Sequence, residues 1–518
     1  MNRKVICFVM SALLIASCKK ERPNFSDTIS YSPLSKPEMD AIILRSLKET
    51  HVFNWSQADE NMVWSALQSS DHLLSVGYCL PGMNAGALDL TAIKINDHEW
   101  TKCRNELLSG ILQMERNINP VLQLKDIIPW EEKVLPVFDV IIYNPETLHW
   151  LRNHHLVRYA EPMGYEPSFK EIAHRKNQPV VQNSSSGCGS NTAAAGLVAN
   201  VDYLIKTPNS LQSWNYSYHQ LPVAWTRTTG AGVKIFLIDT GCEYDQENLN
   251  STFNQGSSSG RVVEHLVTLP QSTFLGIPTG SVETPDDGCG HGTAMAGVCA
   301  APRGTDGNAF GVAYNSHLVT CRAAEDVYLD DSREVKGASD AFTMAANRTD
   351  VKIISMSMGR ITSSSQLRDA VTYAYGKNKL IFCAAGTSLS WTSGWWGVIF
   401  PATMTQVNAV TGVRDTDFNM SCTDCHDGAE TDFTIVMERS SDEHHPLSLA
   451  MNGDKPSTIG GSSVATATAA GIAALVWSRF PAYSRDQVLN KMITTSNNYP
   501  NRNASLGWGN LNADAATR

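Results

Sequence analysis

The carboxyl-terminal half of the chain alternates short, continuously apolar segments with segments whose apolar residues recur at helical spacing. The apolar segments, which predict buried strands, lie at 233–241, 317–323, 351–359, 379–386 and 407–413. Helices are predicted near 338–347, at 365–376 and after Gly460. Buried strands that alternate with helices predict an α/β fold, in which a mostly parallel sheet carries helices on both faces. Functional side chains in such sheets collect at the carboxyl ends of the strands.

A second pattern occupies residues 85–165, where helical segments are set between strand-like segments. The predicted strands lie at 88–95, 134–143 and 157–162, and the predicted helices at 97–114 and 144–155. This order predicts a small α+β domain of the ferredoxin-like kind. Two helix-like segments, 37–49 and 56–68, precede it, and the second has Ser56 as a candidate cap.

The two patterned regions are joined by residues 166–213, which are rich in Ser, Gly, Asn and Pro around the stretch QNSSSGCGSN. A segment of this composition predicts an exposed connection that is open to proteolysis. The chain contains no internal repeat. We therefore expect two folded units with a cleavable link between them.

The first residues have the pattern of an export signal, in which Arg3 and Lys4 precede an apolar stretch from Val5 to Ala16. That stretch is too short to span a bilayer. It ends in IASC, which resembles a bacterial lipobox and implies that residues 1–17 are removed and Cys18 is lipidated. An ordinary signal peptide with a chance cysteine is the alternative. Under either interpretation the mature protein lies outside the cytoplasm, either secreted or held as a bacterial lipoprotein at the periplasmic face or cell surface.

Composition narrows the function classes. The 518 residues are 42% hydrophobic and 18% charged, as in globular proteins. The formal net charge of −10 argues against a nucleic-acid partner, whose binding surface would be basic. Export allows the cysteines to form disulfides. Cys422 and Cys425 can close a small loop, and Cys242 and Cys289 lie in segments that we expect to be neighbours, although pairing does not follow from sequence.

Three short segments carry candidate chemistry. Asp239 ends an apolar strand in IDTGCE, His291 begins an Ala-rich segment in GHGTAMAGV, and two serines begin another in GGSSVATA. Each feature alone is common in caps, loops and turns. Together they supply what acyl transfer needs, because a hydroxyl becomes nucleophilic when an imidazole takes its proton and a carboxylate orients that imidazole.

The order Asp, His, Ser in these surroundings resembles the subtilisin-like serine proteases, the subtilases. The matching stretches are GAGVKIFLIDTG, GHGTAMAGV and GSSVATATAAGIAAL, and the resemblance covers 214–518 as a catalytic domain. It implies a serine endopeptidase with a triad of Asp239, His291 and Ser463. The family's nucleophile is the third residue of G-T-S, so Ser463 takes that role and Ser462 that of a turn or cap hydroxyl.

One departure from the family concerns the oxyanion site. The family has A-A-G-N, whose Asn donates to the oxyanion, whereas this chain has Thr387 after CAAG. The resemblance implies that the backbone N–H of Ser463 and the shorter Thr387 hydroxyl share this role. Loss of the Asn donor lowers turnover by about 10²–10³ in subtilisin, so a weaker enzyme is expected.

The resemblance also implies where a substrate binds. In the family an extended peptide adds as a strand beside S-L-G and A-A-G segments. These match Ser357, Met358 and Gly359 on one side and Ala384, Ala385 and Gly386 on the other. Trp391, Trp395 and Trp396 either line the cleft or cover a loop.

Residues 85–165 resemble the back half of the subtilase inhibitory propeptide. The implied zymogen has an anchor and helical segment at 18–84, the propeptide-like domain at 85–165 and a maturation site within 166–213. An unrelated amino-terminal binding domain is the alternative.

Two short motifs favour other chemistry. Cys422, Cys425 and His426 have the C-x-x-C-H spacing of a haem attachment site, with a local disulfide as the alternative. His444 and His445 are candidate metal ligands, with a solvated acidic loop as the alternative. We expect no cofactor and assign no metal ligands. Structural calcium, which is common in the family, is the open alternative, and no acidic loop here is assigned to it.

The expected partners are therefore a protein or peptide substrate, the chain's own prodomain as an inhibitor, and a membrane reached through the lipid. A protein that keeps the fold as a binding or scaffold module, with turnover weakened at Thr387, is the alternative function.

Overall fold

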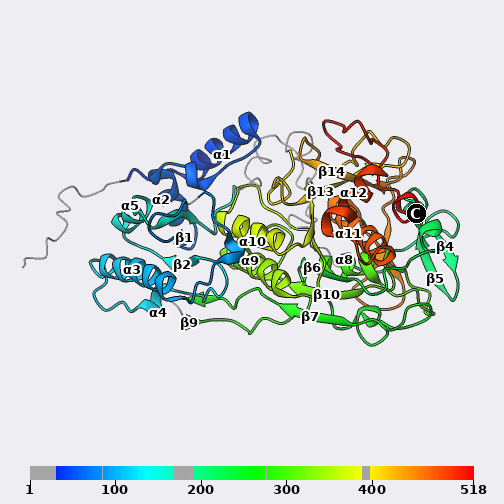
Figure 1. Ribbon diagram of the computed structural model, residues 1–518, viewed down its shortest axis with the longest axis horizontal. Coiled ribbons are helices and arrows are strands. Elements are labelled where there is room, and N and C mark those ends of the chain that lie inside the picture. Colours follow the sequence, from blue (N-terminus) through cyan, green and yellow to red (C-terminus); the bar gives the residue numbers. More distant parts are fainter. Residues whose placement is uncertain (1–30, 85, 168–187, 189–190, 275–276, 388–396) are drawn as a thin grey trace, which may run out of the picture.

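The computed structural model describes residues 31–84, 86–167, 188, 191–274, 277–387 and 397–518 (Figure 1). Its main feature is a seven-stranded parallel sheet with the strand order β14-β13-β12-β11-β6-β10-β7. The strands are β6 (Lys234–Asp239), β7 (Val263–Val267), β10 (His317–Arg322), β11 (Ile353–Met356), β12 (Leu380–Ala384), β13 (Asn408–Arg414) and β14 (Thr431–Glu438). The prediction of an α/β fold with a mostly parallel sheet is confirmed.

The strands read as apolar runs because the sheet is buried on both faces. In β6, Ile235 and Leu237 pack in one apolar cluster, whereas Phe236 and Ile238 pack in a second one on the opposite face. The first cluster contains helices α8 (His291–Ala300) and α11 (Gly461–Arg479), and the second contains α9 (Ser332–Asn347) and α10 (Ser365–Gly376). Two layers of helices therefore enclose the sheet, as Figure 1 shows.

Helix α11 runs through the centre of the first cluster. Among the described residues it is the one helix long and apolar enough to cross a membrane, but 89% of its apolar window is buried inside the protein. Small side chains bring it close to its neighbours, since a Cβ on Gly471 would lie 2.7 Å from the Cβ of Val312. Its composition thus reflects burial in a protein core.

Shorter elements complete the carboxyl-terminal part of the chain, residues 191–518. The helices and turns are η3 (Trp214–Ser217), α7 (Leu221–Ala224), η4 (Glu247–Leu249), α12 (Arg485–Thr494) and α13 (Ala513–Ala516). Three hairpins pair β4 (Tyr203–Lys206) with β5 (Ser210–Ser213), β8 (Thr273–Phe274) with β9 (Ile277–Pro278), and β15 (Leu447–Leu449) with β16 (Pro456–Thr458).

An amino-terminal unit precedes this part. Its strands β1 (Leu73–Tyr78), β2 (Val137–Ile141) and β3 (Val157–Pro162) form an antiparallel sheet in the order β2-β1-β3. Its helices and turns are α1 (Lys36–Thr50), η1 (Trp55–Gln57), α2 (Glu60–Gln68), η2 (Leu90–Ala92), α3 (His98–Glu115), α4 (Leu124–Ile127) and α5 (Pro145–Arg152). One apolar cluster extends from Met39 to Tyr165, so α1 and α2 pack with this sheet.

The strand predicted at 88–95 is wrong. That segment contains the short turn η2, where the Asp89 carboxylate accepts a hydrogen bond of 3.0 Å from the N–H of Thr91. The strand lies earlier, at Leu73–Tyr78, which is buried throughout. Alternation along 88–95 therefore reflects a capped turn on a half-buried surface. Helix α2 is likewise capped by Asp59 instead of Ser56.

The amino-terminal sheet lies against α9 and α10 (Figure 1), and both apolar and polar side chains make this contact. Leu135, Val137 and Tyr159 belong to the same apolar cluster as α9 and α10. Glu161 accepts hydrogen bonds from the N–H (2.9 Å) and hydroxyl (2.7 Å) of Ser365 at the start of α10. Lys336 on α9 pairs with Glu132 at 3.1 Å, and Arg158 pairs with Asp369. The contact is therefore a buried interface in which capping bonds and ion pairs accompany apolar packing.

The described residues leave several sequence predictions outside the structure. These are the signal segment with Cys18, residues 168–187 and 189–190 of the connection, and the three tryptophans at 391, 395 and 396.

Candidate active site

Asp239 and His291 meet at the carboxyl edge of the parallel sheet. Asp239 is the last residue of β6. The later strands lie on both sides of β6, with β10 on one side and β11 on the other, so the direction in which strands are added to the sheet changes there. Such a switch point is where open α/β sheets form their binding crevice. His291 is the first residue of α8, and its Nδ1 lies 2.7 Å from Oδ1 of Asp239.

Both side chains of this pair are removed from water, with exposed fractions of 5% for His291 and 1% for Asp239. Burial disfavours the imidazolium, but the charge and hydrogen bond of Asp239, helped by the charge of Asp287, hold the pKa of His291 above its ordinary value. The imidazole is thus prepared to accept a proton, and its Nδ1 is fixed toward the carboxylate.

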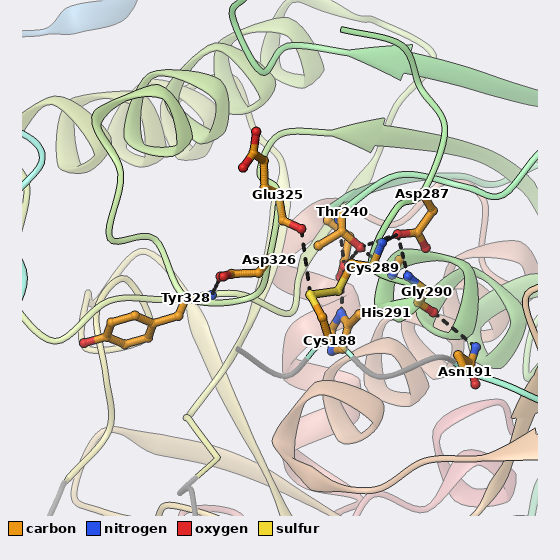
Figure 2. The surroundings of a disulfide bond; sticks show 12 residues. Cys188, Asn191, Thr240, Asp287, Cys289, Gly290, His291, Glu325, Asp326 and Tyr328 are labelled. Atoms are coloured by element: carbon orange, nitrogen blue, oxygen red, sulfur yellow. Dashed lines mark hydrogen bonds and ion pairs between the residues drawn. A yellow bond between two sulfur atoms is a disulfide. The ribbon is translucent and has the colours of Figure 1, made fainter. Parts of the chain in front are cut away.

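A second carboxylate, Asp287, ties the histidine loop to the end of β6 (Figure 2). It is fully buried, and its Oδ1 accepts hydrogen bonds from the Thr240 hydroxyl (2.8 Å) and from the N–H of Gly290 (2.8 Å). Its Oδ2 accepts from the N–H and hydroxyl of Thr293 at 2.8 and 2.7 Å. Thr240 in turn accepts from the N–H of Gly292 at 2.9 Å. Asp287 therefore fixes the backbone on both sides of His291.

Sequence reasoning missed Asp287. The signal was an Asp four residues before the histidine that begins a helix, since a carboxylate near a helix start satisfies its free N–H groups.

A disulfide lies beside the same loop and joins Cys188 to Cys289, two residues before His291 (Figure 2). The expectation that Cys242 and Cys289 lie in neighbouring segments fits the hydrogen bond of 3.0 Å from the Cys242 N–H to the carbonyl of Pro285. Their sulfurs are nevertheless not joined, because Cys242 is a free, buried thiol. No local pattern indicates that Cys188 in the connection is the disulfide partner of Cys289.

The second disulfide joins Cys422 and Cys425, in agreement with their spacing. Both sulfurs that a haem would need are therefore engaged with each other. His426 is buried, which lowers its pKa to about 4. His444 bonds Asp202 at 2.9 Å, and the described residues contain no cluster of acidic, cysteine or histidine side chains that would hold a metal.

The two serines at the start of α11 have different surroundings. Ser463 is partly exposed, and its hydroxyl donates to the carbonyl oxygen of Ser357 at 3.3 Å. The Ser357 hydroxyl donates back to the Ser463 carbonyl at 3.0 Å. Ser462 is buried, and its Oγ accepts a hydrogen bond of 3.1 Å from the N–H of Gly386.

Thr387 forms a hydroxyl pair with Ser462, with 2.9 Å between the two oxygens. The Thr387 oxygen also accepts from the N–H of Ser462 at 3.1 Å. Each hydroxyl has one proton, and the bond between them uses one of the two. One hydroxyl proton of the pair is therefore left for another acceptor.

The segments that the resemblance assigned to substrate follow β11 and β12 at the same edge of the sheet. Ser357, Met358 and Gly359 come directly after β11, and Ala384, Ala385 and Gly386 end β12 or follow it. Gly359 is already paired within the chain, because its N–H donates to Val327 at 3.2 Å and its carbonyl accepts from Leu329 at 3.0 Å. The segment 327–329 thus lies along the edge at Gly359.

Comparison with known proteins identifies the family of the chain that carries Asp239, His291 and Ser463. The Subtilase family model matches residues 230–509, which is more than half of the chain. The chain belongs to the subtilase family.

Individual subtilases agree with this assignment. Alkaline elastase YaB of Bacillus sp. (strain YaB) is 30% identical over 307 residues, which cover 59% of this chain and 70% of that protein. Subtilisin Savinase of Lederbergia lenta is 29% identical over 306 residues, 59% of this chain and 98% of that protein. The crystal structure of MycP1 with its propeptide removed aligns with a TM-score of 0.45 and 22% identity, over 59% of this chain and 97% of that one. The family match and the two relatives identified by sequence make the chain a subtilase-family serine protease.

The buried pair generates a prediction for the charge on His291. Asp239→Asn removes the carboxylate that opposes burial, so the pKa of His291 is expected to fall below its ordinary value of about 6.5. Because the folded-state pKa is raised in the unsubstituted protein, protonation of His291 stabilises the fold. This contribution is present below pH 6.5 and is lost as pH rises through the folded-state pKa.

Histidine NMR titration, with the His291 signal assigned through His291→Gln, measures this pKa directly. The matched control is Asp454→Asn, which changes an exposed carboxylate and is expected to leave the His291 titration where it was. An unchanged midpoint in Asp239→Asn would show that the pair does not control the imidazole.

Proposed function

We propose that this subtilase is an exported serine endopeptidase that cleaves peptide bonds with Asp239, His291 and Ser463 and is made as a zymogen. The observation that carries the proposal is the buried His291–Asp239 pair, 2.7 Å apart, at the sheet edge where α11 begins with a partly exposed serine. A buried imidazole with a raised pKa and a fixed Nδ1 proton is what a general base for a hydroxyl requires.

The reaction uses these groups in sequence. The Ser463 hydroxyl leaves the Ser357 carbonyl and donates to Nε2 of His291, which takes its proton as Oγ bonds to the peptide carbonyl carbon. Asp239 stabilises the imidazolium. His291 then gives the proton to the leaving amine as the C–N bond breaks, and water hydrolyses the acyl-enzyme by the same proton transfers.

The oxyanion would be held where α11 begins. The first N–H groups of a helix have no partner within the helix, and Ser463 is the third residue of α11. Its N–H supplies one donor. The remaining proton of the Thr387–Ser462 hydroxyl pair supplies the second donor. The two hydrogen bonds with Ser462 hold the Thr387 hydroxyl at the start of α11 despite its short side chain.

A fluorophosphonate probe tests the central claim, because it labels only a serine that is activated as a nucleophile. Labelling of the processed protein is expected at Ser463 and is expected to vanish in Ser463→Ala. Ser462→Ala is the matched comparison and should label more slowly but still label, since it weakens only the hydroxyl pair. The scaffold alternative instead predicts no labelling of the processed protein at all, and that result would refute the mechanism.

A second prediction concerns Thr387. Thr387→Val keeps the shape of the side chain but removes the hydroxyl, so kcat is expected to fall by about 10² as for loss of one oxyanion donor. Thr387→Ser restores the hydroxyl and should recover most of the rate. Steady-state kinetics on one peptide substrate measures both. If Thr387→Val retains full kcat, another group holds the oxyanion.

The amino-terminal unit is the inhibitor in this proposal. It covers α9 and α10, and strand β3 is followed by Glu166, which pairs with Arg360 beside the segment assigned to substrate. Cleavage within 166–213 would then cut the peptide link between it and the catalytic domain. The lipobox resemblance adds an anchor at Cys18 and a location on the periplasmic face or the cell surface.

Mass spectrometry of the protein recovered after export tests processing and anchoring together. We expect a catalytic fragment that begins within 166–213 and an amino-terminal fragment that begins at a lipidated Cys18. Ser463→Ala is the control and should stay uncut if the enzyme processes itself. An intact chain in the active protein would refute the zymogen, and an unmodified start beyond Cys18 would refute the anchor.

A further inference from the structure

The carboxylate of Glu166 sits in a socket built by the catalytic part of the chain. The socket consists of Tyr328, Arg360, Ile361 and Thr362, all of which donate hydrogen bonds to it. Glu166 itself is the first residue of the connection and directly follows the amino-terminal unit. One side of the contact therefore belongs to the part that remains after processing, and the other side to the part that leaves.

The socket matches a carboxylate in both charge and geometry. Arg360 approaches Oε1 with Nε at 2.9 Å and with its terminal nitrogen at 2.7 Å. Oε2 accepts from the Tyr328 hydroxyl at 3.0 Å and from the N–H of Ile361 at 3.1 Å. The hydroxyl of Thr362 also donates to Oε1. Backbone donors and a guanidinium that converge on one anion are typical of a carboxylate-binding site.

Arg360 is fully buried while Glu166 is in place. Its Nη1 and Nη2 donate at 3.3 Å to the carbonyls of Met163 and Tyr165, respectively, which belong to the amino-terminal unit. When that unit leaves, the guanidinium loses these acceptors and keeps the Thr362 hydroxyl at 3.0 Å. It is then available to pair with another anion.

The socket also lies at a suitable distance from the proposed nucleophile. Ser357 bonds Ser463 in both directions, and Arg360 follows Ser357 by three residues, a span of at most about 11 Å for extended chain. Segment 327–329 already pairs with Gly359, so a peptide would run along Ser357 and Met358 and approach Arg360 from there, two to four residues before the bond that Ser463 attacks. The socket then faces a substrate side chain.

We propose that Glu166 occupies a specificity site for an acidic substrate side chain. After processing, Arg360, Thr362 and Tyr328 bind the carboxylate of a Glu or Asp that precedes the cleaved bond by two to four residues. This inference rests on the proposed function, because it requires the protease and the departure of the amino-terminal unit. It adds a substrate class, acidic peptides, that catalysis alone does not imply.

One carboxylate of the catalytic part competes for the same arginine. Asp330 lies close enough for burial and the charge of Glu166 to raise its pKa. If Asp330 moves onto Arg360 after processing, the socket is filled from within, and no preference for acidic peptides follows. The experiment distinguishes these outcomes.

The test uses enzyme that has matured from the full chain. Peptides carry a single Glu at each of the four positions before the cleaved bond, and each has a twin with Gln there. At one position, kcat/KM is expected to be about 10-fold higher for Glu than for Gln, as for a charge-assisted hydrogen bond. Salt should reduce this ratio more than it reduces the rate for the Gln twin.

Variants test whether the Glu/Gln ratio of kcat/KM depends on the socket residues. Arg360→Met is expected to bring the Glu/Gln ratio to about one, while the matched control Arg479→Met, at the exposed end of α11, keeps it at about 10. If Arg360→Met does not fold, Tyr328→Phe and Thr362→Val each remove one donor and should lower the ratio about threefold.

Two results would overturn the inference, and they are distinguishable. Cleavage of the Gln peptides with a ratio of one at all four positions refutes the acidic site and leaves the protease intact. Failure to cleave any peptide, together with no fluorophosphonate labelling, refutes the proposed function and this inference with it.

Discussion

The hydrogen bond between Asp239 and His291 is the interaction around which the catalytic half is organised. It joins the end of one strand to the start of a helix that is more than fifty residues away in sequence, and it does so out of contact with water. A buried charged pair is stable only if its surroundings are rigid and its other polar groups are satisfied. The two-sided burial of β6 provides the rigidity, and Asp287 with Thr240 satisfies the backbone around the pair.

The contact between the two halves of the molecule combines apolar packing with buried polar pairs. Leu135, Val137 and Tyr159 of the amino-terminal unit join the apolar cluster of α9 and α10, and Leu73 shares a small cluster with Val335 of α9. Carboxylates of the same unit cap or pair with groups on these two helices. Opening the contact therefore exposes apolar surface to water as well as polar groups, and the exposure of the apolar surface opposes it.

Much of this architecture is visible in the sequence, since continuous apolar runs and helical periods report burial directly. The helix 365–376 and the strands that end at Asp239 and Ala384 were predictable for that reason. Strand β1 was missed although Leu74, Val76 and Tyr78 alternate with Ser75 and Gly77, because the capped turn at Asp89 imitates a longer alternation. The roles of Asp287, Glu166 and Cys188 depend on contacts between distant segments, and local pattern does not report such contacts.

The disulfide between Cys188 and Cys289 gives the position of the cut a consequence beyond activation. A cut before Cys188 leaves no covalent link, so the catalytic part diffuses away from the lipid proposed at Cys18 once the contact between the two parts opens. A cut after Cys188 yields two chains that are still joined by the disulfide, so the catalytic part stays attached to the lipid-anchored amino-terminal part. A few residues' difference in the cleaved bond would thus decide whether the enzyme works at the membrane or is shed from it.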